Sequence, residues 1–435
     1  MQRVLAQFKA SATVRSFAWL VLDRGVRMVL AVFVGLWVAR YLGPGQLGLL
    51  NYALAGVALA GPLAELGFEA VARREFVLAP KSGAVLAGTV LRLRLLGGVM
   101  AAVAIAGVAL LSGMSAKEGR LFVLLAIGLL QPGPMVAESW LQSRLEAGKS
   151  VVPQWIAMCM GAGLRIGAIV WRAPVEAFAA IVVVEMGLAA VLVVGSARAT
   201  GFQFGRFDPS LARRLLSESW PLAVASVAVM IYMRVDILML RWMAGETASG
   251  QYAAAVRLSE LGYFIPMIVA ASVQPLLARL YQGDGKSYLR ELQKYFELST
   301  LMAYVLALPA GLLAPWIIRL AYGPQYADAA VILAVHAWAV VFVFLGVARS
   351  QFLINAGLTQ FSLFCTVAGA VANVILNLFL IPRWGGEGAA MATVVSYAVS
   401  AWMTSFFSHK VRPVGWMQTK AMLSPFTAWR YLCKS

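Results

Sequence analysis

Charged residues that can bind ions interrupt several long apolar segments of this sequence. Arg24 and Arg27 lie one helical turn apart in the first segment, Arg234 lies in a segment near the middle of the chain, and Arg257 follows in the next one. An arginine that faces lipid at the centre of a helix costs at least ~2.5–3.5 kcal/mol. We therefore expect these side chains to face a water-filled cavity or an ion-pair partner. Because few acids lie near them, the pattern favours a path for an anion; the alternative is ion pairs that fix helix packing.

Acidic side chains in the apolar segments indicate a second kind of chemistry. Carboxylates inside a membrane protein are typical of proton relays and cation sites. Four of them are candidates for ion coupling: Asp23, Glu65, Glu138 and Asp236. Glu69 lies one turn after Glu65, and its alternative role is to neutralise Arg73 or Arg74.

The composition shows which elements must position these residues. Hydrophobic residues make up 61% of the 435 and charged residues 13%, whereas a soluble domain is about 45–50% apolar and about 25% charged. A run of about 20 apolar residues crosses a bilayer as one helix, and the runs here are too long for the alternating strands of a barrel. We predict an all-α integral membrane protein with about 12 transmembrane helices. The predicted spans are 15–39, 49–70, 84–110, 120–142, 152–171, 175–196, 217–242, 251–278, 297–319, 329–354, 361–381 and 387–408.

Basic residues determine the predicted orientation. Roughly three times as many Lys and Arg residues flank the spans on the side of the two termini as on the other side, and cytoplasmic loops are the basic ones. We therefore expect both termini in the cytoplasm. The net charge of +17 then forms a collar that meets anionic lipids, so nucleic-acid binding is not expected. Arg92, Arg94 and Arg349 lie toward predicted cytoplasmic helix ends, where we expect them to reach the headgroups as anchors.

The two halves of the sequence resemble each other weakly. The segments GLWVARYLGPGQLGLLNYALA (35–55) and DILMLRWMAGETASGQYAAAV (236–256) each end an apolar helix, pass a turn that contains glycine, and open the next helix with a glycine and a tyrosine. Transporters commonly use such repeats, with the substrate bound between them. The predicted parts are an N-terminal six-helix lobe (1–196), a cytoplasmic linker (197–216), a C-terminal six-helix lobe (217–409) and a basic cytoplasmic tail at the headgroups (410–435).

No stretch of the sequence resembles the active site of an enzyme. The three cysteines lie far apart, the two histidines are isolated, and neither a glycine-rich nucleotide loop nor a nucleophile with a base occurs. We therefore expect no catalysis, no metal site and no cofactor, with H⁺ or Na⁺ as candidate coupling ions.

Three stretches carry a more specific signal. They are ARYLGPGQLGLLNYALA (39–55), YMRVDILMLRWMAGETASGQYAAAVRLSE (232–260) and GAVANVILNLFLIPRWGGEGAAMATVVS (369–396). In the third, Asn373 and Asn377 share one helix face, as polar residues of a cavity or a helix contact would, and Pro382 precedes a glycine-rich turn. Together the stretches resemble Wzx-type polysaccharide flippases of the multidrug/oligosaccharidyl-lipid/polysaccharide (MOP) exporter superfamily.

The resemblance implies two lobes around a central cavity that opens alternately to each side of the bacterial cytoplasmic (inner) membrane. It implies a substrate of undecaprenyl-pyrophosphate carrying an O-antigen or exopolysaccharide repeat unit, held by Arg24, Arg27, Arg234 and Arg257 in the role of cationic cavity residues. A polymerase and other polysaccharide-assembly membrane proteins are implied partners. The alternatives are a lipid II flippase, a cation-coupled multidrug exporter of the same superfamily, which would want an acidic cavity, and a non-transporting membrane scaffold.

Overall fold

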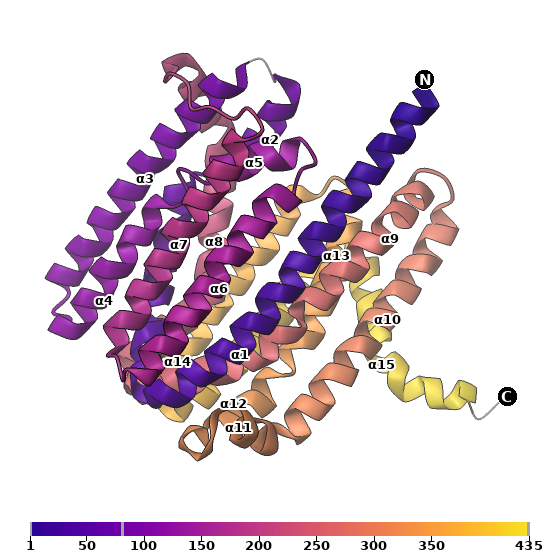
Figure 1. Cartoon of the computed structure of the whole chain (residues 1–435). Coiled ribbons are helices and arrows are strands. Elements are labelled where there is room, and N and C mark those ends of the chain that lie inside the picture. Colours follow the sequence, from indigo (N-terminus) through magenta and orange to yellow (C-terminus); the bar gives the residue numbers. More distant parts are fainter. Residues whose placement is uncertain (1, 80–81, 433–435) are drawn as a thin grey trace. The chain divides into compact units, whose positions relative to one another are not determined.

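Helices make up the regular structure of this chain. A computed structural model describes residues 2–79 and 82–432, and most side chains between Ser16 and Ser424. No strand occurs among these residues, which confirms the predicted all-α class (Figure 1). The α-helices are α1 (Gln2–Glu65), α2 (Phe68–Leu78), α3 (Gly83–Leu111), α4 (Ala116–Ala126), α5 (Val136–Ser143), α6 (Gly148–Val170), α7 (Val175–Arg198), α8 (Pro209–Ser259), α9 (Phe264–Gln282), α10 (Gly285–Leu312), α11 (Ala314–Tyr322), α12 (Ala329–His336), α13 (Ala339–Asn355), α14 (Thr359–Ala401) and α15 (Arg412–Leu432).

Long apolar helices define a multi-pass membrane protein. Within the described ranges, seven helical stretches are long and apolar enough to cross a bilayer. Leu22–Leu78, Pro209–Gln282 and Thr359–Phe407 contain 57, 74 and 49 residues, more than the ~40 that two crossings need. Inside these three stretches α1, α8 and α14 are bent where a glycine has non-helical backbone, at Gly43, Gly245 and Gly385. Twelve crossings remain the prediction.

Several predicted spans are broken helices rather than continuous ones. The segment predicted at 120–142 consists of α4, a 3₁₀ turn at Ile127–Leu130, an irregular stretch and α5. The cause is the sequence Gln131-Pro-Gly-Pro, because proline lacks the N–H that a helix needs and clashes with the preceding turn. Irregular backbone at membrane depth is tolerated where it lines a cavity or is buried in protein. Polar side chains around this break are therefore candidates for a functional site.

The chain separates into two compact units. The first comprises residues 1–42 and 49–230, and the second comprises residues 43–48 and 231–435. The segment predicted as a linker packs onto the first unit: the backbone N–H of Gly205 donates to the carbonyl of Ala84 (2.7 Å), and Phe202 is buried beside Trp140. The hydrogen bond from the Ser210 hydroxyl lowers the pKa of Asp208, which directly precedes α8. The predicted lobe boundaries stay a prediction.

Two turns 202 residues apart have matching geometry within the second unit. Gly43 (φ 70°, ψ 170°) and Gly245 (φ 90°, ψ −179°) break α1 and α8 in the same way. A positive φ is open to glycine and strained for other residues. The turns also touch, because a Cβ on Gly48 would lie 2.0 Å from the carbonyl oxygen of Glu246. The weak sequence repeat therefore corresponds to a repeated backbone feature.

The C-terminal segment forms a packed helix, α15, rather than a tail that only lies at the headgroups. Val414 and Ala421 are buried in the core of the second unit, which α10 and α13 also form. Gln418 is fully buried, accepts a hydrogen bond from Ser405 (3.0 Å) and donates to the carbonyl of Ala401 (2.9 Å). The side chains beyond Ser424 and residues 433–435 lie outside the described part of the chain.

Arg349 is buried and does not act as the predicted headgroup anchor. Its side chain is on α13, and the residue is only 5% exposed. It donates to the hydroxyls of Thr404 (3.0 Å) and Ser405 (3.1 Å) and to the carbonyl of Ser400 (2.8 Å). Hydrogen bonds to these neutral oxygens hold the guanidinium inside the protein, so its role is to tie α13 to the end of α14.

Candidate functional sites in the two helical units

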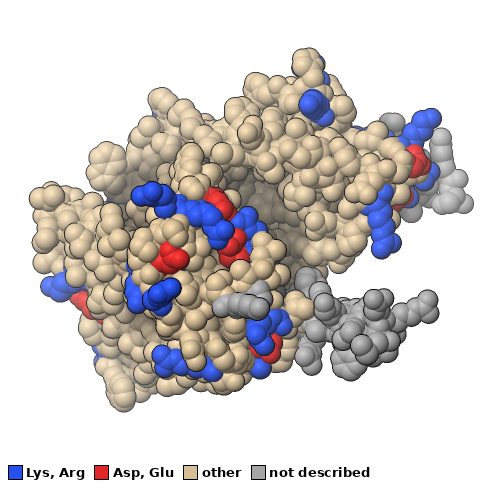
Figure 2. All heavy atoms as spheres, turned by 90° about the horizontal axis from the view of Figure 1, so that it is seen from above, with Lys and Arg blue, Asp and Glu red and all other residues tan. Residues whose placement is uncertain are grey.

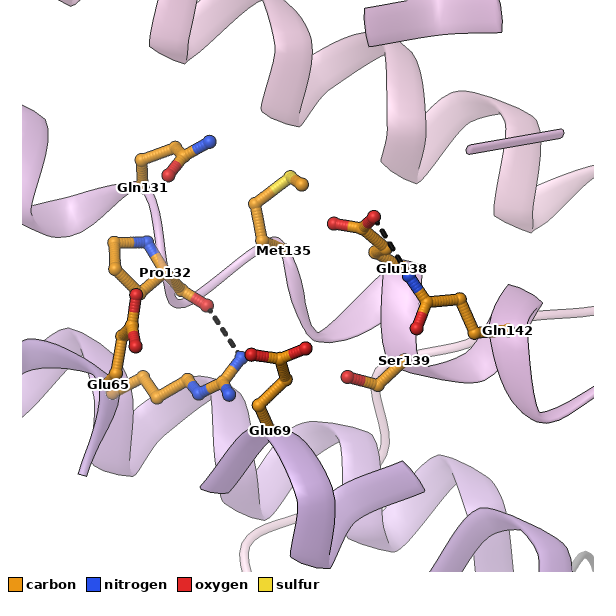
Figure 3. Close-up of a pocket in the computed structure, with 9 residues that line it drawn as sticks. Glu65, Glu69, Gln131, Pro132, Met135, Glu138, Ser139 and Gln142 are labelled. Atoms are coloured by element: carbon orange, nitrogen blue, oxygen red, sulfur yellow. Dashed lines mark hydrogen bonds between the residues drawn. The ribbon is translucent and has the colours of Figure 1, made fainter. Parts of the chain in front are cut away.

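A polar cavity opens beside the broken helix of the first unit. It has a volume of about 140 Å³ and is lined by Glu65, Glu69, Arg94, Gln131, Pro132, Met135, Glu138, Ser139 and Gln142. Figure 3 shows the three carboxylates around it, which come from the end of α1, from α2 and from α5. Three acids and one arginine give the cavity an acidic lining. Two of the predicted coupling residues, Glu65 and Glu138, therefore share one cavity.

Arg94 is the basic residue of this cavity, and the prediction that it is a headgroup anchor is wrong. It is only 4% exposed. One terminal nitrogen donates to the carbonyl of Pro132 (3.1 Å), the dashed line to Pro132 in Figure 3. Its Nε has no hydrogen-bond partner. The carbonyl is available because the Gln131–Pro134 stretch is not helical. A buried guanidinium with an unsatisfied nitrogen is costly unless carboxylates, water or a ligand compensate it.

A chain of hydrogen bonds joins the predicted anion-binding Arg27 to Glu138. Nε of Arg27 donates to both carboxylate oxygens of Asp23 (2.9 and 2.8 Å), four residues earlier on α1. Its Nη2 donates to the amide oxygen of Gln154 on α6 (2.8 Å). The amide nitrogen of Gln154 in turn donates to Glu138 on α5 (3.3 Å). Trp155 completes the network by donating to Asp23 (2.8 Å).

Glu69 takes the neutralising role that was one of its two alternatives. Its carboxylate pairs with Arg73 (2.6 Å), four residues later on α2. The carboxylate is 68% exposed by side-chain area, so this pair contributes little to stability. Glu138 is different, because it accepts hydrogen bonds from two neutral amides, Gln142 (3.0 Å) and Gln154.

The second unit contains a buried carboxylate, Asp236 on α8. Asp236 is 6% exposed and accepts hydrogen bonds from the hydroxyl of Tyr252, from Thr393 (3.2 Å) and from the backbone N–H of Ile237 (3.0 Å). Arg234 is half-buried and interacts electrostatically with Asp236 and with Glu260. The acid and the arginine therefore belong to one buried polar cluster although they are only two residues apart.

The two asparagines of α14 continue this cluster. Asn373 and Asn377 are fully buried. Asn377 donates to Asn373 (3.0 Å), Asn373 donates to Ser396 (3.3 Å), and Ser396 donates to the carbonyl of Thr393 (2.9 Å). The side-chain oxygen of Asn377 has no partner. These contacts cross the glycine-rich turn, so the asparagines hold the two arms of α14 together.

The remaining predicted arginines lie at exposed positions. Arg24 on α1 and Arg257 near the end of α8 are both exposed, and each has partners of its own. Arg257 interacts electrostatically with Glu260. The structure thus brings Arg27 together with Asp23 and Glu138, and Arg234 together with Asp236.

Some residues of the two clusters carried no obvious sequence signal. Gln154 connects Arg27 on α1 to Glu138 on α5, and Tyr252 and Thr393 both donate hydrogen bonds to Asp236. A single polar residue in an apolar run is a weak signal, because Thr and Tyr also occur in helix packing. Among the described residues, no three His, Cys, Asp or Glu side chains gather closely enough to hold a metal ion.

The outer surface has few charges. Figure 2, which views the chain from the end where α1 begins, shows Lys and Arg side chains near acidic ones, with broad uncharged areas around them. In the first unit, Glu75 pairs with Arg214 (2.7 Å) and with Arg74 (3.1 Å), and Arg74 also pairs with Glu218. Large apolar side chains such as Leu110, Leu111 and Trp171 are more than 80% exposed, as expected for a surface that faces lipid.

The fold and these clusters define a class: a helical integral membrane protein with charged residues inside its spans. The chain belongs to the polysaccharide biosynthesis protein family, whose profile matches residues 13–281. The MatE family profile matches residues 221–379. These matches confirm the resemblance to polysaccharide transporters of the MOP superfamily.

Curated relatives are similar over part of their length. The chain is 26% identical to the probable low-salt glycan biosynthesis flippase Agl15 of Haloferax volcanii, over 49% of this chain and 47% of that protein. It is 27% identical to the uncharacterized membrane protein YabM of Bacillus subtilis, over 44% of this chain and 37% of that protein. The chain thus spans less than half of the length of these relatives.

Solved structures have the same fold over most of the chain. An inward-facing multidrug resistance MATE family transporter of the MOP superfamily matches with a TM-score of 0.69 and 18% identity, over 91% of this chain and 94% of that one. The lipid II flippase MurJ in an inward closed conformation matches with a TM-score of 0.68 and 15% identity, over 94% and 92%. These matches show that the fold is MATE- and MurJ-like.

Proposed function

We propose that this protein is a flippase for a polyprenyl-diphosphate-linked oligosaccharide of the O-antigen or exopolysaccharide type. It moves this substrate across the bacterial cytoplasmic membrane by alternating access, through twelve crossings with both termini in the cytoplasm. The family membership and the similarity to Agl15, named a probable glycan biosynthesis flippase, support the proposal. The diphosphate is bound by the arginines at 24, 27, 234 and 257, and the lipid tail stays in the bilayer.

The observation that carries this proposal is the setting of Arg27. Its side chain is 38% exposed, lies in a membrane-spanning helix, and donates hydrogen bonds to Asp23 and Gln154. Because Asp23 fixes its Nε, the guanidinium is oriented to bind a diphosphate through its two terminal nitrogens. The coupling ion, H⁺ or Na⁺, drives transport by binding to membrane-embedded carboxylates, which are those of Asp23, Glu65, Glu138 and Asp236.

Two alternative transport functions are compatible with the same fold. A lipid II flippase is favoured by the MurJ match, and a cation-coupled multidrug exporter by the MatE profile and the acidic cavity of the first unit. Both are transporters, so the distinction lies in the cargo. Anionic lipids are the expected neighbours of the basic ends, and a polymerase and other polysaccharide-assembly membrane proteins are the expected partners.

The test is a flipping assay with purified protein in lipid vesicles. Fluorescent polyprenyl-diphosphate sugars, lipid II and a cationic dye are offered separately, and movement to the inner leaflet or lumen is followed. We expect transport of the lipid-linked sugars, and its loss in Arg27→Ala. The matched control is Arg120→Ala, which removes an exposed arginine paired with Glu176 (3.1 Å) and should leave transport intact. Transport of the dye alone would replace this function with drug export.

A further inference from the structure

The cavity of the first unit and Arg27 are connected by a single amide side chain. The amide oxygen of Gln154 accepts a hydrogen bond from Arg27, and its amide nitrogen donates to Glu138. An amide has one accepting and one donating end. In this orientation the carboxylate form of Glu138 keeps the oxygen of Gln154 turned toward the guanidinium.

Protonation of Glu138 would change what Gln154 can do. A neutral carboxylic acid donates a hydrogen bond through its O–H, whereas a carboxylate only accepts. The acid can therefore donate to the oxygen of Gln154, and the amide then turns its N–H₂ toward Arg27. Two donors cannot bond to each other, so Arg27 loses this partner and its Nη2 becomes available to an anion.

The cavity supplies both access for a proton and a reason for the carboxylate to take one up. Its volume of about 140 Å³ holds several water molecules, which can deliver a proton to the carboxylate. Arg94 lines the cavity with an unsatisfied Nε and is 4% exposed. Because Glu69 is paired with Arg73 (2.6 Å), the ionised carboxylates of Glu65 and Glu138 remain beside Arg94. The cavity then has more negative than positive charge and favours binding of a further positive charge.

Charged groups from three neighbouring helices line the cavity or interact electrostatically with Glu138 on α5. Arg27 and Glu65 come from α1, Glu69 from α2 and Arg94 from α3. The other charges on these neighbours mostly pair elsewhere: Glu75 with Arg214 (2.7 Å), Lys149 with Glu146 (3.2 Å), Arg165 with Glu185 (2.6 Å) and Glu176 with Arg120 (3.1 Å).

We propose that Glu138 is a proton-binding site that controls the availability of Arg27 through Gln154, so that proton uptake from the cavity strengthens diphosphate binding in the first unit. The proton passes from water to a carboxylate oxygen, and no other bond is made or broken. This inference rests on the proposed function, since it assigns Arg27 a diphosphate ligand. Gln154 is a positioning residue and does not itself contact the substrate.

The experiment measures binding of farnesyl diphosphate to the full-length protein in detergent, over a series from mildly acidic to mildly alkaline pH. We expect the affinity of the unaltered protein to rise on acidification by at least about fivefold, the low end of typical coupling between sites. Glu138→Gln keeps a donor at the same position and should give the acidic-side affinity at every pH. Gln154→Leu should also remove the excess pH dependence, because it cuts the connection.

Gln142→Leu is the matched control. Gln142 donates to the same carboxylate of Glu138 (3.0 Å) but belongs to α5, so the variant should keep the pH dependence of the unaltered protein. Titration of the farnesyl diphosphate itself is common to all variants and cancels in the comparison. Melting temperatures show whether each variant is folded. If either Glu138→Gln or Gln154→Leu fails to fold, the remaining variant tests the relay.

The outcomes separate the two proposals. Binding that depends on pH equally in the unaltered protein, Glu138→Gln and Gln154→Leu overturns the relay and leaves the flippase function standing. Binding that survives unchanged in Arg27→Ala overturns the relay as well, because the diphosphate then sits elsewhere. No binding at any pH overturns the proposed function together with this inference.

Discussion

Gly48 and Gly250 lie so close to each other that neither position has room for a side chain. A Cβ on Gly48 would lie 2.8 Å from the backbone nitrogen of Gly250, and a Cβ on Gly250 would lie 1.8 Å from the carbonyl oxygen of Pro44. Both glycines open the second arm of a bent helix, five residues after the glycine at the bend. The two turns of the second unit therefore meet at equivalent positions of the sequence repeat.

This contact predicts a specific loss of stability. Gly48→Ala and Gly250→Ala should each lower the free energy of unfolding by about 1–3 kcal/mol or more, because the backbone must move apart to admit a methyl group. Gly45→Ala is the control, since its Cβ would approach nothing nearer than the hydroxyl of Thr247 at 3.9 Å. Thermal melting in detergent measures all three. Equal melting temperatures for Gly48→Ala and Gly45→Ala would show that the turns are not in contact.

Arg234→Ala separates substrate binding from structure. If the arginine binds diphosphate, translocation of lipid-linked sugar should be lost while the melting temperature stays near that of the unaltered protein, and Arg234→Lys should restore part of the activity because lysine lacks the two-pronged donor geometry. If it mainly neutralises Asp236 or Glu260, its removal leaves a buried charge unpaired at a cost of about 3–5 kcal/mol. Both quantities are measured on one purified preparation. If the variant is destabilised but its folded fraction transports normally, Arg234 does not bind the diphosphate.

Asp236 is predicted to couple transport to an ion. Asp236→Asn is nearly isosteric and can still accept from Tyr252 and Thr393, so we expect folding to survive but the dependence of transport on pH or Na⁺ to weaken. Glu65→Gln, in the cavity of the first unit, is compared in the same vesicles. Normal rates and an unchanged ion response in both variants would exclude these two carboxylates as coupling residues.

The orientation in the membrane is open to a direct test. Reporter fusions after Ser115 and Gly245 should be periplasmic, and fusions after Lys149 and Gly205 should be cytoplasmic, because the basic flanks are retained on the cytoplasmic side. Enzymatic reporters that work on one side only provide the readout. The reverse pattern at all four positions would mean that the protein has the opposite orientation, with the cavity of the first unit toward the periplasm.

The helical class and the charged positions were predictable because hydropathy and the cost of burying charge act locally along the chain. The break at Pro132 interrupts the predicted span 120–142, where the hydropathy of the segment hides the effect of its two prolines. Arg94 was misplaced because its partner is the Pro132 carbonyl, which only a broken helix makes available. Asp23 and Arg27 are four residues apart on one helix, so the spacing alone is compatible with the ion pair that they form. Gln154 could not be found, because its role depends on which helices pack together.

The contact between the turns at residues 43–48 and 245–250 also has a consequence for how the protein is made. The first turn leaves the ribosome some 200 residues before its partner, a delay of roughly 10–40 seconds at ordinary rates of synthesis. During this time the backbone groups around Pro44 and Gly48 must be satisfied by water or by the insertion machinery. An N-terminal half produced alone would keep that turn uncovered permanently. Such a half should therefore be degraded faster than the whole chain, and co-expression of the second half from residue 209 onward should protect it.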